Sequence, residues 1–348
     1  MKFEIANKPV GENNPAFIIA ELSANHNQNF ELALKSIDAI KECGADAVKL
    51  QTYTADTITI DCDNEHFQIK QGTIWDGTTL YKLYQQAFTP WEWQPKLKEY
   101  AQSLGLICFS SPFDKSAVDF LETLNVPAYK IASFEIVDIP LIEYTATKGK
   151  PIIISTGIAT EDEIKEAVEA CIKVGNNQIA LLKCTSEYPA KIEDANLLSI
   201  PYLKEKYKTV VGLSDHTLGT TASITAVALG ANIIEKHFIL DRAIGGPDSS
   251  FSLEPTDFKQ MVTAIRDAEK SLGKPSFDLT EKVKRSRNFS RSLFAVKDIL
   301  KGEVLTEINV RSIRPANGLP PKELPNILGK IAASNISKGT PINWELIE

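Results

Sequence analysis

The sequence has no long hydrophobic run and no cysteine pattern. No stretch of its 348 residues approaches the ~20 apolar residues that a helix needs to cross a bilayer, and the N-terminal MKFEIANKPVGENNP lacks the apolar core of a signal peptide. The cysteines are odd in number and never in CxxC spacing, so we expect free thiols in a reducing compartment and a cytoplasmic protein with no membrane partner. They are Cys43, Cys62, Cys108, Cys171 and Cys184.

Basic residues are not in excess either. Lysine and arginine number 38 against 45 aspartates and glutamates, a net charge of −7, and the two signs are interleaved. This balance argues against nucleic acid as a partner, because phosphate backbones need a basic surface. One short basic cluster is interpreted as a solvated linker face: Lys282, Lys284, Arg285, Arg287 and Arg291.

What is present is a regular alternation of short apolar runs and amphipathic stretches. Stretches such as Glu31–Cys43 and Thr160–Val174 have helical periodicity. Eight strand–helix units predict an α/β fold, a (β/α)8 TIM barrel, and their number favours it over a doubly wound open sheet. The runs are Phe17–Ala20, Ala47–Leu50, Ile107–Phe109, Ala128–Ile131, Ile152–Ile154, Ile179–Leu182, Val210–Leu213 and Ile233–Ile234.

Two regions depart from this alternation. The connection of residues 53–89 is long for a compact domain and contains Trp75, Tyr81 and Tyr84, which is typical of a lid or binding loop. Near the C-terminus, DILKGEVLTEINV (298–310) is echoed by NISKGTPINWELI (335–347), which predicts a small module of short strands and turns. The predicted organisation is a barrel domain over 1–276, a linker over 277–292 and a β-rich module over 293–348.

Nearly every expected strand ends in polar or charged residues, at the end of the barrel where active sites lie. Lysines near a core are costly unless they meet an anion, so Lys49, Lys130 and Lys183 indicate an anionic substrate. Glu21 is interpreted as a general acid/base or a partner of metal-bound water, or else as a salt-bridge partner of these lysines. Other strand-end candidates are Gln51, Ser133, Glu135, Ser155, Ser186, Tyr188 and Ser214.

Two of the four histidines end consecutive expected strands. His216 and His237 should therefore be neighbours, either as ligands of a divalent metal with open coordination positions or as two hydrogen-bonded rim residues. His66 is expected on the surface. His26 is expected either at the rim or in contact with the site.

These same residues lie in stretches that resemble a known family. FIIAELSANHN, DAVKLQTY, FSSPF, YKIASFE, ISTGIAT, LLKCTSEYP, VGLSDHTLG, IIEKHF and GGPDSSFS, in this order, are similar to the N-acetylneuraminate (sialic acid) synthase family. That family joins a (β/α)8 barrel to a C-terminal antifreeze-like (SAF) domain, which RSLFAVKDILKGEVLT and RPANG resemble. KLQTYT, SSPF, KIASFE and CTSEYP resemble its pseudaminic acid synthase branch.

The resemblance implies an enzyme that condenses phosphoenolpyruvate with 2,4-diacetamido-2,4,6-trideoxy-L-altrose, giving pseudaminic acid and phosphate for flagellin and surface glycans. It implies a divalent metal, Mn²⁺ first with Mg²⁺ or Co²⁺ as alternatives, and a domain-swapped homodimer. Together with the strand-end candidates, the resemblance gives four expected roles. The metal ligands are His216 and His237, and the catalytic residues are Glu21 and Lys130. The residues that bind phosphoenolpyruvate are Lys49, Lys130, Ser133, Ser155, Ser186 and Ser214, and those that bind the sugar are Gln51, Glu135, Tyr188, Asp248 and Arg314.

Three alternatives stay open. The acceptor could instead be that of a neuraminate or legionaminate synthase, and the chain could be a non-catalytic carbohydrate-binding protein. A Schiff base on Lys130 or Lys183 is the rival mechanism.

Two residues depart from the pattern of sialic acid synthases. Ser186 replaces an Asn that is usual there, and Phe134 replaces a smaller residue of the neuraminate branch. The bulky apolar side chain of Phe134 suits a 6-deoxy sugar better than a hydroxylated one.

Overall fold

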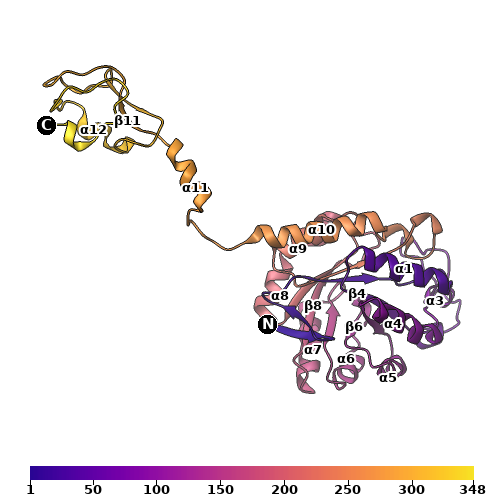
Figure 1. Ribbon diagram of the computed structural model, residues 1–348. Helices are drawn as coiled ribbons and strands as arrows, with labels where there is room; N and C mark the ends of the chain where they lie inside the picture. Colours follow the sequence, from indigo (N-terminus) through magenta and orange to yellow (C-terminus); the bar gives the residue numbers. More distant parts are fainter. The chain divides into compact units, whose positions relative to one another are not determined.

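The computed structural model describes residues 1–348 as two compact units, Met1–Gly273 and Lys274–Glu348 (Figure 1). The first contains a closed parallel barrel surrounded by helices, and the second contains a two-stranded antiparallel sheet. No helix is both long enough and apolar enough to cross a membrane.

Eight parallel strands form the barrel, and β10 pairs with β3 to close it, with His237 opposite Glu21. Strands covered by helices are buried on both faces, which explains why each run is continuously hydrophobic. Seven of the eight predicted runs lie within these strands and the fourth begins one residue before β6, so the TIM barrel is confirmed and the open sheet is wrong. The strands are β3 (Phe17–Glu21), β4 (Ala47–Thr52), β5 (Ile107–Pro112), β6 (Tyr129–Ile131), β7 (Ile152–Ser155), β8 (Ile179–Cys184), β9 (Val210–Asp215) and β10 (Ile233–His237).

Some of the helices around the barrel begin at side-chain caps. The Asn29 side chain accepts a hydrogen bond from the Leu32 N–H at the start of α1, and Thr160 and Glu163 form a capping box on α7. The helices around the barrel are α1 (Phe30–Glu42), α4 (Gln94–Ser103), α5 (Lys115–Thr123), α6 (Ile139–Ala146), α7 (Glu161–Lys173), α8 (Ser199–Tyr207), α9 (Thr221–Ala228) and α10 (Pro255–Leu272).

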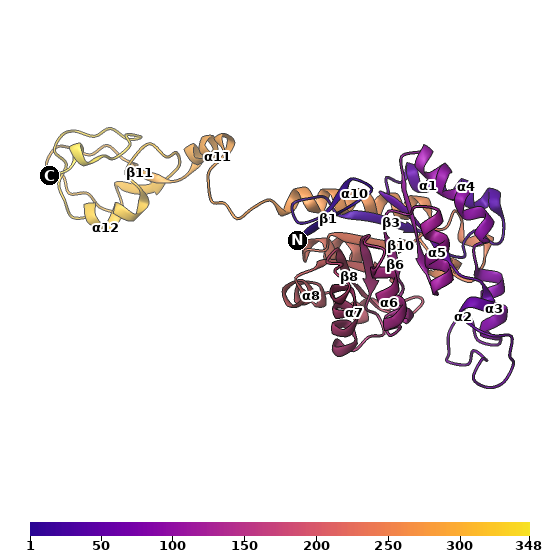
Figure 2. The same ribbon diagram turned by 90° about the horizontal axis from the view of Figure 1, so that it is seen from below.

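An antiparallel hairpin, β1 (Lys2–Ile5) and β2 (Lys8–Gly11), precedes the barrel and is an addition to the predicted fold. Its turn residues Ala6 and Asn7 both have positive φ, which matches the twist that a tight hairpin needs. Phe3, Ile5 and Val10 are buried in the same core as the barrel. The N-terminus and α3 lie at opposite ends of the barrel unit in both views (Figures 1 and 2).

The long connection after β4, which we call the β4–α4 excursion (residues 53–89), contains two short helices. These are α2 (Ala55–Ile58) and α3 (Leu80–Ala87), and the loop between them is braced by a bridge from Gln68 to Thr79. Figure 2 shows α2, α3 and this loop projecting from the barrel. The excursion is therefore placed to form a wall at the barrel mouth.

The second unit contains α11 (Glu281–Ser286), β11 (Ser292–Ala295), β12 (Val310–Ile313) and α12 (Leu324–Ile327). The sequence echo is a structural two-fold: Ile299 and Ile336 exchange backbone hydrogen bonds of 2.8 Å in both directions. Asp298 accepts from the Lys338 N–H, and Asn335 accepts from the Lys301 N–H, each at 2.8 Å. The two copies therefore stabilise each other around a small apolar core.

Candidate active site

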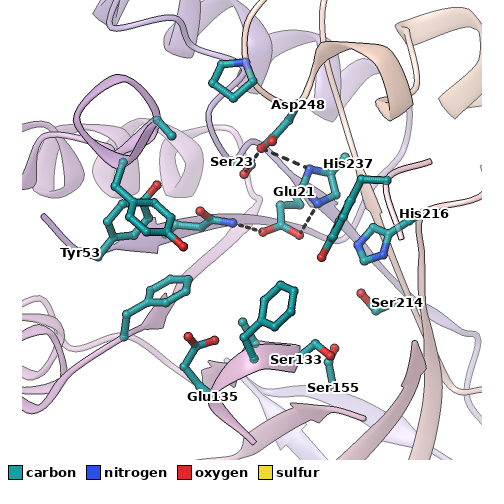
Figure 3. A pocket seen from close by; sticks show the side chains of 18 of the residues that line it. Glu21, Ser23, Tyr53, Ser133, Glu135, Ser155, Ser214, His216, His237 and Asp248 are labelled. Atoms are coloured by element: carbon teal, nitrogen blue, oxygen red, sulfur yellow. Dashed lines mark hydrogen bonds and ion pairs between the residues drawn. The ribbon is translucent and has the colours of Figure 1, made fainter. Parts of the chain in front are cut away.

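A cavity of about 650 Å³ opens at the carboxyl ends of the barrel strands. Its surface has two parts. The barrel supplies a polar floor, and the β4–α4 excursion supplies an apolar wall. Figure 3 shows Tyr53 and Glu135 across this cavity from His216 and Ser214. Predicted site residues that line it are Glu21, Lys49, Gln51, Lys130, Ser133, Glu135, Ser155, Tyr188, Ser214, His216, His237 and Asp248.

The floor contains four buried charges of alternating sign. Lys49 Nζ lies 3.0 Å from Glu21 Oε1 and 3.0 Å from Glu235 Oε1, and Lys130 Nζ lies 3.3 Å from the same Glu235 oxygen. All four side chains are almost fully buried. Buried charges persist only when they are paired, so the two carboxylates stabilise two ammonium groups at the floor of the cavity.

The pKa values follow from that pairing. Burial alone would raise the pKa of Glu21, but Lys49 above all, then His237 and Lys130, hold it well below its ordinary value. Burial likewise opposes ionisation of Glu235, and Lys130 and Lys49 lower its pKa overall. Burial lowers the pKa of Lys130, while at Lys49 the two carboxylates outweigh burial and raise it. Glu21 is thus an ionised carboxylate that can accept a proton or orient water.

The two histidines adjoin this network, with ring centroids 5.4 Å apart. His216 Nδ1 lies 2.9 Å from the Thr185 carbonyl, which it can donate to, leaving its Nε2 lone pair free. His237 Nε2 is 3.3 Å from Glu21 Oε2, and its buried Nδ1 has no hydrogen-bond partner. Burial lowers the pKa of His237 and favours the neutral imidazole that binds a cation.

These donors fit a divalent metal held by few protein ligands. No three His, Cys, Asp or Glu side chains converge closely enough to enclose an ion by themselves. An ion on His216 and His237 would therefore keep positions for water and substrate, which is the arrangement of an open rather than a structural site. Asp248 Oδ2 is 3.9 Å from His237 Nδ1 and accepts from Ser23 Oγ at 2.5 Å (Figure 3).

Serine hydroxyls form the side of the floor next to Lys130. Ser186 Oγ donates to Ser133 Oγ at 2.7 Å, and Ser214 Oγ donates to Glu235 at 3.2 Å. Ser155 Oγ is buried with no partner, which is the state of a group that awaits a ligand. Ser186 itself does not line the cavity and reaches it through Ser133.

Four residues named from the sequence lie elsewhere. Lys183 is not in the cavity, because adjacent strand residues face opposite sides and Cys184 takes the inward position. His26 is buried outside the cavity and bonds Thr89 and the Gln28 N–H, and His66 is exposed. Arg314 belongs to the second unit, where it is exposed.

Glu235 follows the eighth predicted run, Ile233–Ile234, but no role is assigned to it from the sequence. The period of two along a strand puts Glu235 and His237 on the inward face and Lys236 on the outward face, so the signal was present. Lys236 instead pairs with Asp215 at 2.7 Å behind the histidines.

The comparisons with known proteins agree with this architecture. Residues 36–276 match the NeuB family, and residues 290–348 match the SAF domain. The chain is 53% identical over 323 residues to the pseudaminic acid synthase of Campylobacter jejuni, covering 93% of this chain and 94% of that relative. It is 37% identical over 349 residues to the N,N'-diacetyllegionaminic acid synthase of Legionella pneumophila, covering 98% and 97%.

A solved structure is similar too. The N-acetylneuraminic acid synthetase of Leptospira borgpetersenii, crystallised with citrate, has a TM-score of 0.73 and 34% identity, covering 82% of this chain and 95% of that one. The chain therefore belongs to the NeuB family and is an enzyme of the sialic acid synthase type, with a (β/α)8 barrel followed by a SAF domain.

Proposed function

We propose that the protein condenses phosphoenolpyruvate with 2,4-diacetamido-2,4,6-trideoxy-L-altrose to give pseudaminic acid and phosphate. The observation that carries the proposal is the buried Lys49 and Lys130 pair beside His216 and His237 in one cavity. The 53% identity to a pseudaminic acid synthase supports this acceptor over that of the 37% identical legionaminate enzyme. The complete set of charges and imidazoles speaks against a non-catalytic carbohydrate-binding role.

We assign each residue of the cavity a role from its position. Lys130, Lys49, Ser133, Ser155 and Ser214 hold the phosphate and carboxylate of phosphoenolpyruvate, which aligns its C3 with the sugar aldehyde. The new bond joins C3 to the aldehyde carbon. Water then adds at C2, and the tetrahedral intermediate expels phosphate by C–O cleavage.

Glu21 is placed to take or give the proton at this stage, because it is ionised beside Lys49 and His237. Gln51 and Asp248 are our proposed contacts for the sugar hydroxyls and amides. A divalent cation, Mn²⁺ first with Mg²⁺ or Co²⁺ as alternatives, would be held by His216 and His237 and would polarise the aldehyde oxygen.

The chemistry is tested by phosphate release from phosphoenolpyruvate with a panel of sugars. We expect the 6-deoxy diacetamido altrose to react far better than N-acetylmannosamine. With ¹⁸O in the bridging oxygen, the label should leave in phosphate, and borohydride with pyruvate should trap no adduct. An adduct on Lys130 would establish the Schiff-base rival, and equal rates with N-acetylmannosamine would assign the neuraminate branch.

The metal is tested by chelation and substitution. Replacing His216 or His237 by Ala should abolish activity and Mn²⁺ binding measured by calorimetry, while His66→Ala, at an exposed histidine, should change neither. Chelator should inactivate the wild-type protein, and Mn²⁺ should restore it. Full activity of metal-free protein would rule out the metal role.

We also propose a homodimer in which Arg314 completes the partner's sugar site. Arg314 is exposed and forms no ion pair or side-chain hydrogen bond within its own unit, which leaves its guanidinium free for a ligand. The Pro and Gly of its RPANG segment favour a rigid loop. We place the enzyme in the cytoplasm, where its five free cysteines would stay reduced.

A further inference from the structure

The wall of the cavity is apolar and comes largely from the β4–α4 excursion. Ile69, Trp75, Leu80 and Tyr84 line it from the excursion, and Phe113 and Phe134 complete it from the ends of β5 and β6. Phe134 remains 56% exposed although it lines the cavity. Large apolar side chains that are solvent-exposed at a cavity can pack against an apolar part of a ligand and bury it.

Trp75 is the fixed point of this wall. Its indole Nε1 donates to the Pro247 carbonyl at 2.8 Å, so the excursion is fastened to the loop that carries Asp248. Its ring lies 5.3 Å from the ring of Tyr188, and Tyr188 lies 4.5 Å from the ring of His216. Only one aromatic ring therefore separates Trp75 from a candidate metal ligand.

This geometry sets which end of the acceptor meets the wall. The ammonium groups of Lys49 and Lys130 and the two histidines occupy the floor, where the aldehyde carbon must lie. The rest of an open-chain sugar then extends toward the excursion. Its remote end meets a wall made mainly of rings and aliphatic chains, to which the excursion also adds Gln71 and Thr73. A hydroxyl packed against the rings would lose its water without gaining a partner.

We propose that Trp75 is a specificity-determining residue whose ring packs against the remote end of the acceptor and selects a methyl group there over a hydroxymethyl group. The inference rests on the proposed function and deepens it. An apolar wall discriminates only modestly between a methyl and a hydroxymethyl group. The preference for a 6-deoxy sugar over its 6-hydroxy counterpart should therefore be on the order of 100-fold.

Two substitutions separate the ring from its hydrogen bond. Trp75→Ala removes this ring from the wall and should lower the preference for the 6-deoxy acceptor by ~10-fold or more, mainly through a higher KM for that sugar. Trp75→Phe keeps an aromatic surface but cannot donate to Pro247, and should retain most of the preference. Neither change should alter the KM for phosphoenolpyruvate, which binds at the floor.

The matched control is Tyr81→Ala. Tyr81 is an aromatic residue of the same excursion that bonds Asp56 and does not line the cavity, so its loss should leave the preference unchanged. Calorimetric titration with the same two sugars gives the comparison independently of turnover. Circular dichroism and the KM for phosphoenolpyruvate report whether each variant is folded.

The outcomes distinguish this inference from the proposed function. A wild-type enzyme that uses and binds the 6-hydroxy sugar as well as the 6-deoxy sugar overturns both. A wild-type preference that survives in folded Trp75→Ala overturns the role of Trp75 alone. A fall in preference in Trp75→Ala but not in Tyr81→Ala supports it, and an equal fall in both would reduce Trp75 to a general support of the excursion.

Discussion

At the scale of single residues, Glu135 gives the cavity a pH dependence. Burial raises the pKa of its carboxyl to about 7, with Asp138 adding to the rise and Lys130 and Lys49 opposing it, and its Oε2 has no hydrogen-bond partner. The folded protein therefore binds this proton more tightly than the unfolded chain. The contribution of Glu135 to the free energy of unfolding is therefore highest when its carboxyl is protonated. It falls as the pH rises from the carboxyl's pKa in the unfolded chain toward its folded pKa of about 7.

Glu135→Gln should remove this fall. Between pH 4.5 and pH 8, the variant should gain stability relative to the wild-type protein by roughly 3 kcal/mol, measured by urea unfolding at each pH. Glu187→Gln, at an exposed position nearby, should give a pH profile parallel to that of the wild-type protein. Parallel profiles for Glu135→Gln as well would mean that the Glu135 carboxyl has the same pKa in the folded protein as in the unfolded chain.

Gly157 shows how one missing side chain shapes the floor. A Cβ there would lie 2.2 Å from Ser186 Oγ and 2.6 Å from Ser133 Oγ, so Gly157→Ala must separate these two hydroxyls. We expect the KM for phosphoenolpyruvate to rise by about 10-fold, the value of one lost hydrogen bond. Ser186→Ala removes the same bond without a clash and is the comparison. An unchanged KM in both would show that this pair does not position the substrate.

At the scale of elements, β9 and β10 are joined behind the histidines by a buried ion pair. Asp215 accepts from Lys236, Ser223 and the Thr217 hydroxyl, and neither charged side chain is more than 1% exposed. Lys236→Met would leave the Asp215 carboxylate unpaired and should cost about 3–5 kcal/mol of stability by denaturant unfolding. The exposed pair of Lys270 and Asp267 is the control, and Lys270→Met should have no measurable effect.

The compensating test is Lys236→Met combined with Asp215→Leu. Replacing both charges by apolar groups removes the unpaired carboxylate and should recover much of the lost stability. A double variant no more stable than the single one would show that the loss comes from packing rather than from charge.

At the scale of the whole molecule, the proposed sharing of a site between subunits predicts complementation. Arg314→Ala and His237→Ala proteins should each be inactive alone. When they are mixed and their subunits exchange, one site in each heterodimer contains both residues, so phosphate release should reappear. If exchange is verified by mass spectrometry and no activity returns, Arg314 acts within its own subunit or not at all.

The sequence by itself determined the elements and the edge on which chemistry lies. Eight strands read as unbroken apolar runs because each is covered on both faces, and the polar residue after each run had to fall at the barrel mouth. The echo around Ile299 and Ile336 likewise marked the small domain as two similar halves.

Only the tertiary structure decided which of those polar residues meet. Lys49, Lys130 and Glu235 come from three strands, and the two lysines contact the same oxygen of Glu235, a relation that depends on barrel closure and register. Lys183 resembles them in sequence but faces away, and Gly157 acquires its role from two serines that follow other strands. Periodicity along a chain reports one strand at a time, whereas charge pairing and steric exclusion depend on distances between strands.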